Sequence, residues 1–115
     1  MAIVTHKDIG NNIRVIAVTE RLDLGGTEKI EPAFSALVNA GSKRIVVDIS
    51  DVTFLSSVGI RMLIANAKLL QAAGGRMVLT VGFNAAAIRT LKMVCVDSII
   101  PMFETQAAAE AALGD

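Results

Sequence analysis

The sequence predicts an α/β fold: a mixed, mostly parallel sheet with an antiparallel edge hairpin, flanked by about four helices. Three observations support this prediction. Strand-like segments alternate with segments of helical periodicity, which favours right-handed crossovers between parallel strands. Residues 3–5 and 13–18 resemble strands and are separated by the turn-forming residues 8–12, which predicts a hairpin. Residues 44–49 contain the apolar run that is typical of a strand buried on both faces of its sheet.

The first helix should follow the break at residues 22–27 and run toward Ala40, with Asp23 and Thr27 as the candidates for its cap. Pro32 has no N–H group to donate. We therefore expect a loose first turn or a kink there, with regular helix only after Pro32.

The later elements follow from the same patterns. Residues 50–57 should form a loop, residues 58–73 a helix, and residues 77–81 the next strand. Asn84 should cap a helix that runs through Leu91, residues 99–100 should lead into a last short strand, and residues 105–113 should form a terminal helix.

The apolar face of the central helix should consist of Ile60, Leu63, Ile64, Ala67 and Leu70. We expect Ile64→Ala to cost about 2–5 kcal/mol, and we expect the deepest burial at Val46, Val47 and Ile49.

Composition argues against several classes of function. The chain has 115 residues, which suits one domain over residues 1–115, and 11 basic residues balance 11 acidic ones. We therefore expect no nucleic-acid partner and no membrane insertion. The single His6 cannot hold zinc alone, and Cys95 should be a small core residue. We expect no cofactor, no metal and a cytoplasmic location.

Functional side chains are expected in two loops at the carboxyl ends of strands, residues 21–27 and 50–59. Ser56 and Ser57 have two compatible interpretations, as helix caps and as phosphorylation sites, since a helix N-terminus favours negative charge. No nucleophile and base pair is visible, so we predict that the protein is not an enzyme. Three acids are candidates for a metal cluster, but a cap, a strand-end carboxylate and a solvated charge explain them better: Asp23, Asp48 and Asp51. The scattered charges are expected to be solvated: Arg14, Arg21, Lys43 and Arg44.

The segment from Val46 to Leu63 resembles the STAS signature of the anti-sigma factor antagonist family. That signature is an apolar strand ending in Asp, a short loop with an aromatic residue, and Asp-Ser-Ser-Gly at the start of a helix. Supporting resemblances lie in Leu22-Asp23, in residues 74–79 and in residues 91–103, so the likeness covers essentially the whole chain. It implies a single STAS-like domain.

One departure from the family motif concerns regulation. Ser56 occupies the usual Asp position and Val58 occupies the usual phosphoacceptor position, so only Ser57 matches in type. The resemblance implies partner switching: the unmodified antagonist binds an anti-sigma factor, often also its serine kinase, and phosphorylation breaks the complex until a phosphatase restores it. Our candidate phosphoacceptors are Ser57 and then Ser56. The alternative is a structural STAS subunit, not phosphorylated, in a signalling scaffold or a transporter complex.

A mixed apolar and charged patch at the same helix start suits a protein interface. The predicted partner-binding residues are Asp23, Leu24, Ser56, Ser57, Val58, Gly59, Arg61 and Met62. Such a patch predicts that changing Arg61 and Met62 together weakens binding and leaves the melting temperature nearly unchanged. We expect a monomer or a weak homodimer.

Overall fold

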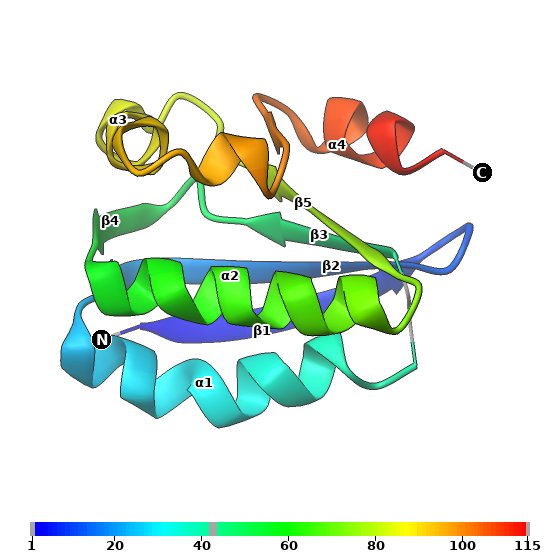
Figure 1. The fold of residues 1–115 in the computed structure, drawn as a ribbon, viewed down its shortest axis with the longest axis horizontal. Coiled ribbons are helices and arrows are strands. Elements are labelled where there is room, and N and C mark those ends of the chain that lie inside the picture. The colour runs from blue at the N-terminus through cyan, green and yellow to red at the C-terminus, as the bar shows by residue number, and fades with distance from the viewer. Residues whose placement is uncertain (1, 42–43, 115) are drawn as a thin grey trace.

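The strands of the protein form one six-stranded sheet in the computed structural model, which describes residues 2–41 and 44–114 (Figure 1). The strands are β1 (Ile3–Ile9), β2 (Ile13–Leu22), β3 (Arg44–Asp48), β4 (Val52–Leu55), β5 (Arg76–Thr80) and β6 (Met102–Phe103). Their order is β1-β2-β3-β5-β6, with β4 paired to β2 off this path, so β1 and β2 form the hairpin at one edge.

The hairpin is the antiparallel part of this sheet. Ile9 pairs with Ile13 across residues 10–12. The Ile13 N–H donates to the Gly10 carbonyl, and Asn11 and Asn12 between them both have positive φ, as the central residues of a type I′ turn do. The other strand pairs are parallel, with Val15, Val46 and Val78 in register across β2, β3 and β5. The predicted mixed sheet with an antiparallel edge is therefore confirmed.

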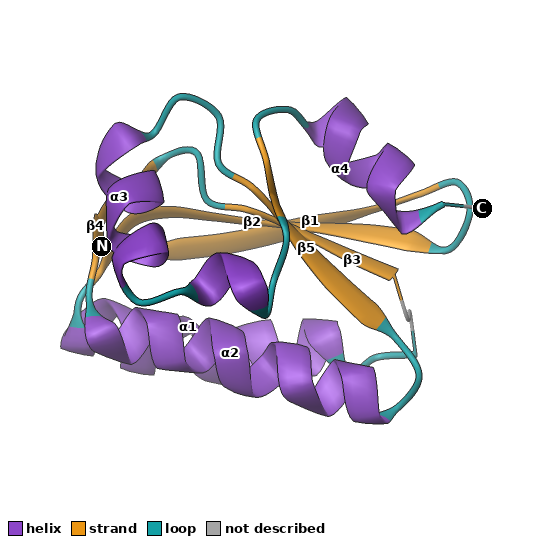
Figure 2. Cartoon of the chain, turned by 45° about the horizontal axis from the view of Figure 1, so that its top comes forward, coloured by secondary structure: helices purple, strands orange, loops and turns teal. Residues whose placement is uncertain are grey.

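Helices cover both faces of the sheet. The four helices of the described chain are α1 (Leu24–Val38), α2 (Ser57–Ala72), α3 (Ala85–Met93) and α4 (Gln106–Leu113), with the 3₁₀ turn η1 (Val96–Ser98) after α3. Figure 2 shows α1 and α2 side by side below the sheet and α4 above it. Asn84 caps α3, as the sequence predicts, and the predicted terminal helix over residues 105–113 is confirmed as α4, with Thr105 as its N-cap and Gly114 as its C-cap.

Two apolar clusters hold these layers together. The larger one contains Ile16, Val47 and Leu63 with the buried sides of α1, α2 and α3, and the smaller one joins Val46 and Val78 to Ala109 of α4. Val46, Val47 and Ile49 are each 0% exposed, which confirms their predicted burial.

Two predicted elements differ from the structure. Residues 52–55 form strand β4 instead of part of a loop; Val52 and Leu55 are buried while Thr53 and Phe54 are exposed, so the segment lacks the alternation that marks a strand. Helix α1 is continuous from Leu24 to Val38, so the expectation that regular helix begins after Pro32 is wrong. Pro32 lies on the exposed side of α1, where water can reach the carbonyl that the missing N–H leaves unpaired.

Three side chains are also placed differently from expectation. Cys95 is exposed and has a φ of 58°, because it lies in the turn between α3 and η1 rather than in the core. Ile64 is half-buried at the edge of the core. Arg14 is only 13% exposed: its guanidinium pairs with Asp8 at 2.6 Å and donates to the Leu37 carbonyl at 3.0 Å. Lys43 lies outside the described residues.

Candidate functional site

Two helices begin side by side at the carboxyl end of β2. Asp23 caps α1, where its Oδ1 accepts a hydrogen bond from the Gly26 N–H at 2.8 Å. Ser56 caps α2, where its Oγ accepts from the Gly59 N–H at 3.3 Å. The caps are neighbours because β2 and β4 are parallel and pair Leu22 with Leu55, so both chains turn into helices at the same level.

A glycine at the third residue of each helix lets the helix start approach β2. A Cβ atom on Gly59 would lie 3.0 Å from the Leu22 Cβ and 3.1 Å from the Leu22 carbonyl oxygen. A Cβ atom on Gly26 would overlap the Arg21 carbonyl oxygen. The two loops are therefore packed against one strand end, and the surface that they present is fixed by that packing.

Asp23 carries a stable negative charge at this site. Its pKa is lowered first by the hydrogen bond from the Gly26 N–H and then by Arg21, whose Nε lies 3.2 Å from Oδ2. The Arg21 guanidinium also lies 4.7 Å from the centroid of the Phe54 ring, its cross-strand neighbour. The Arg21 side chain remains 58% exposed, which agrees with the expected solvated charge, and it also contacts Asp23 and Phe54.

The two serines differ in their surroundings. The Ser56 hydroxyl is half-buried and donates to the Leu22 carbonyl at 2.6 Å while it accepts from the Gly59 N–H, so the predicted capping role is confirmed for Ser56. Ser57 is exposed as the first residue of α2, and within the described chain its hydroxyl has no hydrogen-bond partner. Ser57 is therefore the serine that a second protein can reach.

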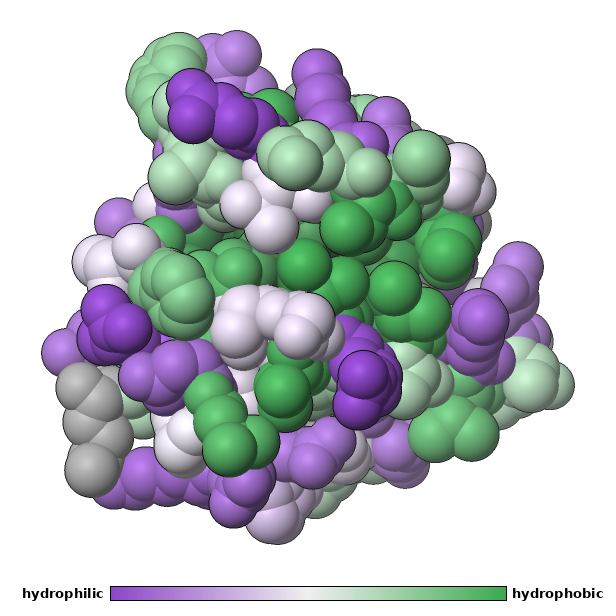
Figure 3. Space-filling view, turned by 60° about the vertical axis from the view of Figure 1, so that its left-hand side comes forward, coloured by the Kyte–Doolittle hydropathy of each residue, from purple (hydrophilic) through white to green (hydrophobic). Residues whose placement is uncertain are grey.

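The surface around Ser57 combines apolar and charged groups. Leu24 is 58% exposed, Phe54 is 44% exposed, Val58 is half-buried and Arg61 is exposed. Figure 3 looks toward this end of the molecule and shows hydrophobic surface across its middle with hydrophilic residues around it. The structure thus brings Asp23, Leu24 and the start of α2 into one exposed region.

Two of the predicted partner-binding residues are not at the surface. Met62 is 2% exposed and belongs to the larger core, so the expectation that it can be changed without loss of stability is wrong. Gly59 is buried against Leu22 and supports the site through its backbone alone.

The three acids that resembled a metal cluster have other surroundings. Asp48 accepts hydrogen bonds from the Ser50 N–H at 2.9 Å and from the Ser50 hydroxyl at 2.5 Å, and Asp51 is exposed. In residues 2–41 and 44–114, no group of three or more His, Cys, Asp or Glu side chains is arranged to hold a metal ion. In the same ranges, no helix has the length and apolar character needed to cross a membrane.

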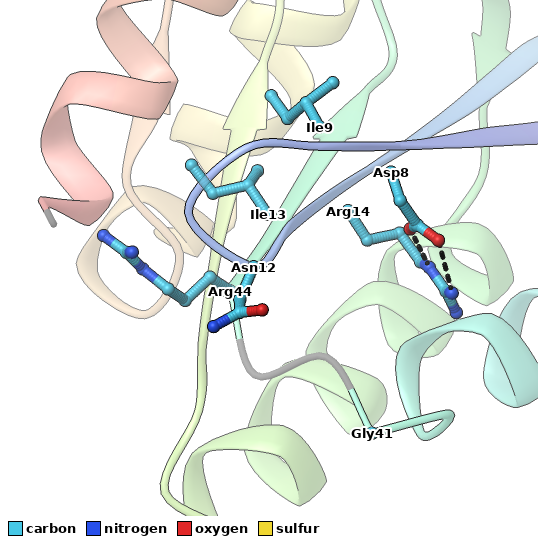
Figure 4. Close-up of a pocket in the computed structure, with 7 residues that line it drawn as sticks. All are labelled: Asp8, Ile9, Asn12, Ile13, Arg14, Gly41 and Arg44. Atoms are coloured by element: carbon cyan, nitrogen blue, oxygen red, sulfur yellow. Dashed lines mark hydrogen bonds and ion pairs between the residues drawn. The ribbon is translucent and has the colours of Figure 1, made fainter.

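A hollow at the opposite end of the sheet lies beside the hairpin turn (Figure 4). Figure 4 shows Arg14 turned toward Asp8, while Arg44 extends away from them toward the C-terminal helix. Arg44 donates to the Asn11 and Leu113 carbonyls, so it fastens the turn to α4. The two arginines that line this hollow are therefore used in contacts that hold the fold together.

Comparison with known proteins identifies the family. The STAS domain model matches residues 3–109, which is most of the chain. The chain belongs to the STAS domain family. A search of curated protein sequences finds no match to this chain.

Solved STAS structures share the fold. An anti-sigma factor antagonist from Mycobacterium paratuberculosis is 24% identical, with a TM-score of 0.89 over 100% of this chain and 96% of that one. A STAS domain protein from Planctomyces limnophilus is 23% identical, with a TM-score of 0.81 over 98% of this chain and 97% of that one. The phosphorylated form of the Bacillus cell fate determinant SpoIIAA is 17% identical, with a TM-score of 0.69 over 96% of this chain and 98% of that one.

Sequence reasoning missed part of this end of the molecule. The sequence identified Phe54 only as the aromatic residue in the loop of the STAS signature and did not predict that it lies exposed beneath Arg21. Phe83 and Met93, which flank α3, are 88% and 76% exposed. Isolated apolar residues next to a helix give no signal of exposure in the sequence.

Proposed function

We propose that this STAS protein is a regulatory binding module of the anti-sigma factor antagonist type, which takes part in partner switching with a serine kinase that is also an anti-sigma factor. Family membership and the fold that it shares with solved antagonists support a regulatory role. The observation that carries the proposal is the start of α2, where the exposed Ser57 lies among Leu24, Val58 and Arg61. The protein then acts as a binding partner and a kinase substrate, not as an enzyme.

The geometry suits a partner that contacts both helix starts together. Leu24 offers an exposed apolar side chain on α1, and Val58 and Arg61 offer apolar and cationic groups on α2. Apolar anchors with Arg at their border are common in protein interfaces. A phosphate on Ser57 would add about −1.5 to −2 charges in the middle of this surface. The amides of the first turn of α2 would tolerate that charge, so its main effect would fall on the partner.

Binding can be tested with a matched pair of leucine variants. Leu24 and Leu69 are 58% and 60% exposed on helices, but Leu69 lies in the last turns of α2, away from the two helix starts. Titration calorimetry with each kinase-type anti-sigma factor of the same genome should find one that binds the wild type. Leu24→Glu should weaken that binding about tenfold or more, since it places an unpaired charge in the interface, whereas Leu69→Glu should not. Equal loss in both variants, or no binding partner, would overturn the proposal.

A second candidate function rests on Val58 and Ser56. Val58 has no hydroxyl, and the hydroxyl of Ser56 is already used to donate to Leu22 and to cap α2. These two features favour a STAS subunit that holds a scaffold or a transporter complex together without being phosphorylated. Stable binding of a scaffold or transporter STAS partner, with no binding of any kinase, would support this second function.

A further inference from the structure

Charge is distributed unevenly along a chain whose net charge is zero. Between Asp51 and Asp97 the sequence contains no aspartate or glutamate, but it contains five basic residues: Arg61, Lys68, Arg76, Arg89 and Lys92. Arg76 lies at the start of β5 and donates to the Ala112 carbonyl. The other four lie on α2 and α3, so these two helices together carry four positive side chains and no negative one.

These four cations are not used inside the molecule. Each side chain is exposed, and none has an ion pair or a hydrogen-bond partner among residues 2–41 and 44–114: Arg61, Lys68, Arg89 and Lys92. Their field therefore extends into the solvent, where it can attract an oppositely charged molecule over about the Debye length of 8–10 Å.

Exposed apolar side chains lie at the two ends of the helix that carries Arg89 and Lys92. Phe83 and Met93, at the two ends of α3, are among the most exposed large apolar residues of the described chain. The Asn84 amide fastens the start of α3 to β4 by donating to the Val52 carbonyl at 2.7 Å, and α2 begins just after β4. Consequently α3, β4 with Phe54, and the first turn of α2 lie at one end of the molecule (Figures 1 and 2).

We propose that this end of the molecule binds an acidic face of the partner protein. The surface, called here the α2/α3 surface, consists of Phe54, Arg61, Phe83, Arg89, Lys92 and Met93. The proposal rests on the proposed function, because the α2/α3 surface shares Arg61 with the Ser57 region. It adds that the contact extends to α3 and that the partner supplies carboxylates.

The chemistry of the surface favours a protein partner over a nucleic acid. Aromatic residues, Met and Arg are the residue types that interfaces enrich, and unpaired cations around them require negative groups on the other side. A phosphate backbone would neutralise the cations but would leave Phe83 and Met93 with no apolar surface to bury against.

Association kinetics with the kinase partner test the surface. The double variant Arg89→Glu/Lys92→Glu should associate about tenfold more slowly than wild type at low salt, and the difference should shrink as salt is raised. Lys7→Glu is a control with half the change in charge: Lys7 is exposed on β1 near the hairpin turn, at the other end of the sheet, and its replacement should leave the rate within about twofold. Unfolding curves establish that each variant is folded.

The outcomes separate this inference from the proposed function. If the partner binds but the double variant associates at the wild-type rate at every salt concentration, the α2/α3 surface is overturned while the proposed function stands. If no kinase binds, NMR titrations with four defined probes decide. These are a Glu-rich amphipathic peptide, its Lys-for-Glu counterpart, a DNA duplex and phosphatidylglycerol vesicles. Shifts on α2 and α3 with the acidic peptide alone support the inference, whereas binding of DNA or vesicles, or of no probe, overturns it.

Discussion

Gly26 is the residue on which the start of α1 depends. A side chain there would overlap the Arg21 carbonyl, whereas nothing lies within 4 Å of a Cβ atom on the preceding Gly25. Gly26→Ala should therefore lower the free energy of unfolding by more than about 2 kcal/mol, and Gly25→Ala should change it by less than about 1 kcal/mol. Urea unfolding measures both. Similar costs at the two positions would mean that the helix start does not pack against β2 as described.

Of the two candidate phosphoacceptors, Ser57 should be modified in preference to Ser56. The Ser57 hydroxyl is exposed, while modification of Ser56 would break its hydrogen bonds to Leu22 and Gly59. Incubation with the cognate kinase and ATP, followed by mass spectrometry, should find phosphate that disappears in Ser57→Ala and persists in Ser56→Ala. One factor opposes phosphorylation of Ser57. It lies one residue before position 58, the usual phosphoacceptor position of the family, so its hydroxyl is turned by about 100° around the helix relative to that position. Binding without incorporation of phosphate would indicate a permanently active binder.

The helix caps could be predicted from the sequence more reliably than the exposure of the side chains around them. Asp23 and Ser56 precede apolar helical segments, and capping needs only this local pattern. Exposure depends on how distant elements pack. Met62 precedes Leu63 at the border of the apolar face of α2, and its burial follows from packing within the assembled core, which periodicity alone does not define.

At the scale of single elements, Pro32 makes α1 less stable than the same helix would be with an ordinary helix-forming residue at this position. It lies inside the helix and is exposed, so it contributes little packing, and the Glu28 carbonyl loses its usual helical donor. Pro32→Ala should raise the free energy of unfolding by about 1–3 kcal/mol. Thermal unfolding checks this, with Ala33→Ser at the next exposed position as a control of small effect. A lower melting temperature for Pro32→Ala would mean that the proline stabilises the fold through the unfolded state.

Helix α2 offers a direct comparison of a buried and a half-buried residue. Leu63 is 0% exposed, whereas Ile64 packs at the edge of the same cluster. Leu63→Ala should cost about 2–5 kcal/mol. The structure revises our expectation for Ile64→Ala downward, to less than about 2 kcal/mol, because fewer atoms leave a closed core. Equal losses in chemical denaturation would contradict this placement.

The elements that the sequence failed to predict are those without a local pattern. Strand β4 is four residues long, and its two buried residues are at its ends, so its existence depends on pairing with β2 rather than on alternation. By contrast, α2, β3 and β5 have long periodic or apolar segments and were predicted close to their actual ends. The mostly parallel direction of the strands followed from the alternation of strands and helices, whereas the order of the strands across the sheet was not predicted.

At the scale of the whole molecule, the two faces of the sheet are covered unequally. Helices α1 and α2 cover one face along its length (Figure 2), whereas the eight-residue α4 covers part of the other face over Val46 and Val78. Short helices with few buried residues open locally at low free energy. The docking of α4 therefore depends on polar contacts in addition to its single fully buried residue, Ala109.

Arg44 joins α4 to both the sheet and the hairpin turn. Its guanidinium donates to the Leu113 carbonyl at 2.6 Å and to the Asn11 carbonyl at 2.8 Å, which joins the end of α4 to the hairpin turn. Arg76 adds a single bond of 2.9 Å to the Ala112 carbonyl. Both arginines thus act on carbonyls at the C-terminal end of α4, where positive charge is favourable.

Replacing Arg44 should loosen α4 without unfolding the protein. Arg44→Met keeps an apolar stem but removes both hydrogen bonds, so amide hydrogen exchange should become faster in α4 and in residues 10–12, while α2 and β3 keep their protection. Arg76→Met removes one bond and should accelerate exchange in α4 alone, to a smaller extent. A uniform increase across the chain in Arg44→Met would contradict the local role, because it would show that Arg44 supports the global fold and that α4 does not open as a separate unit.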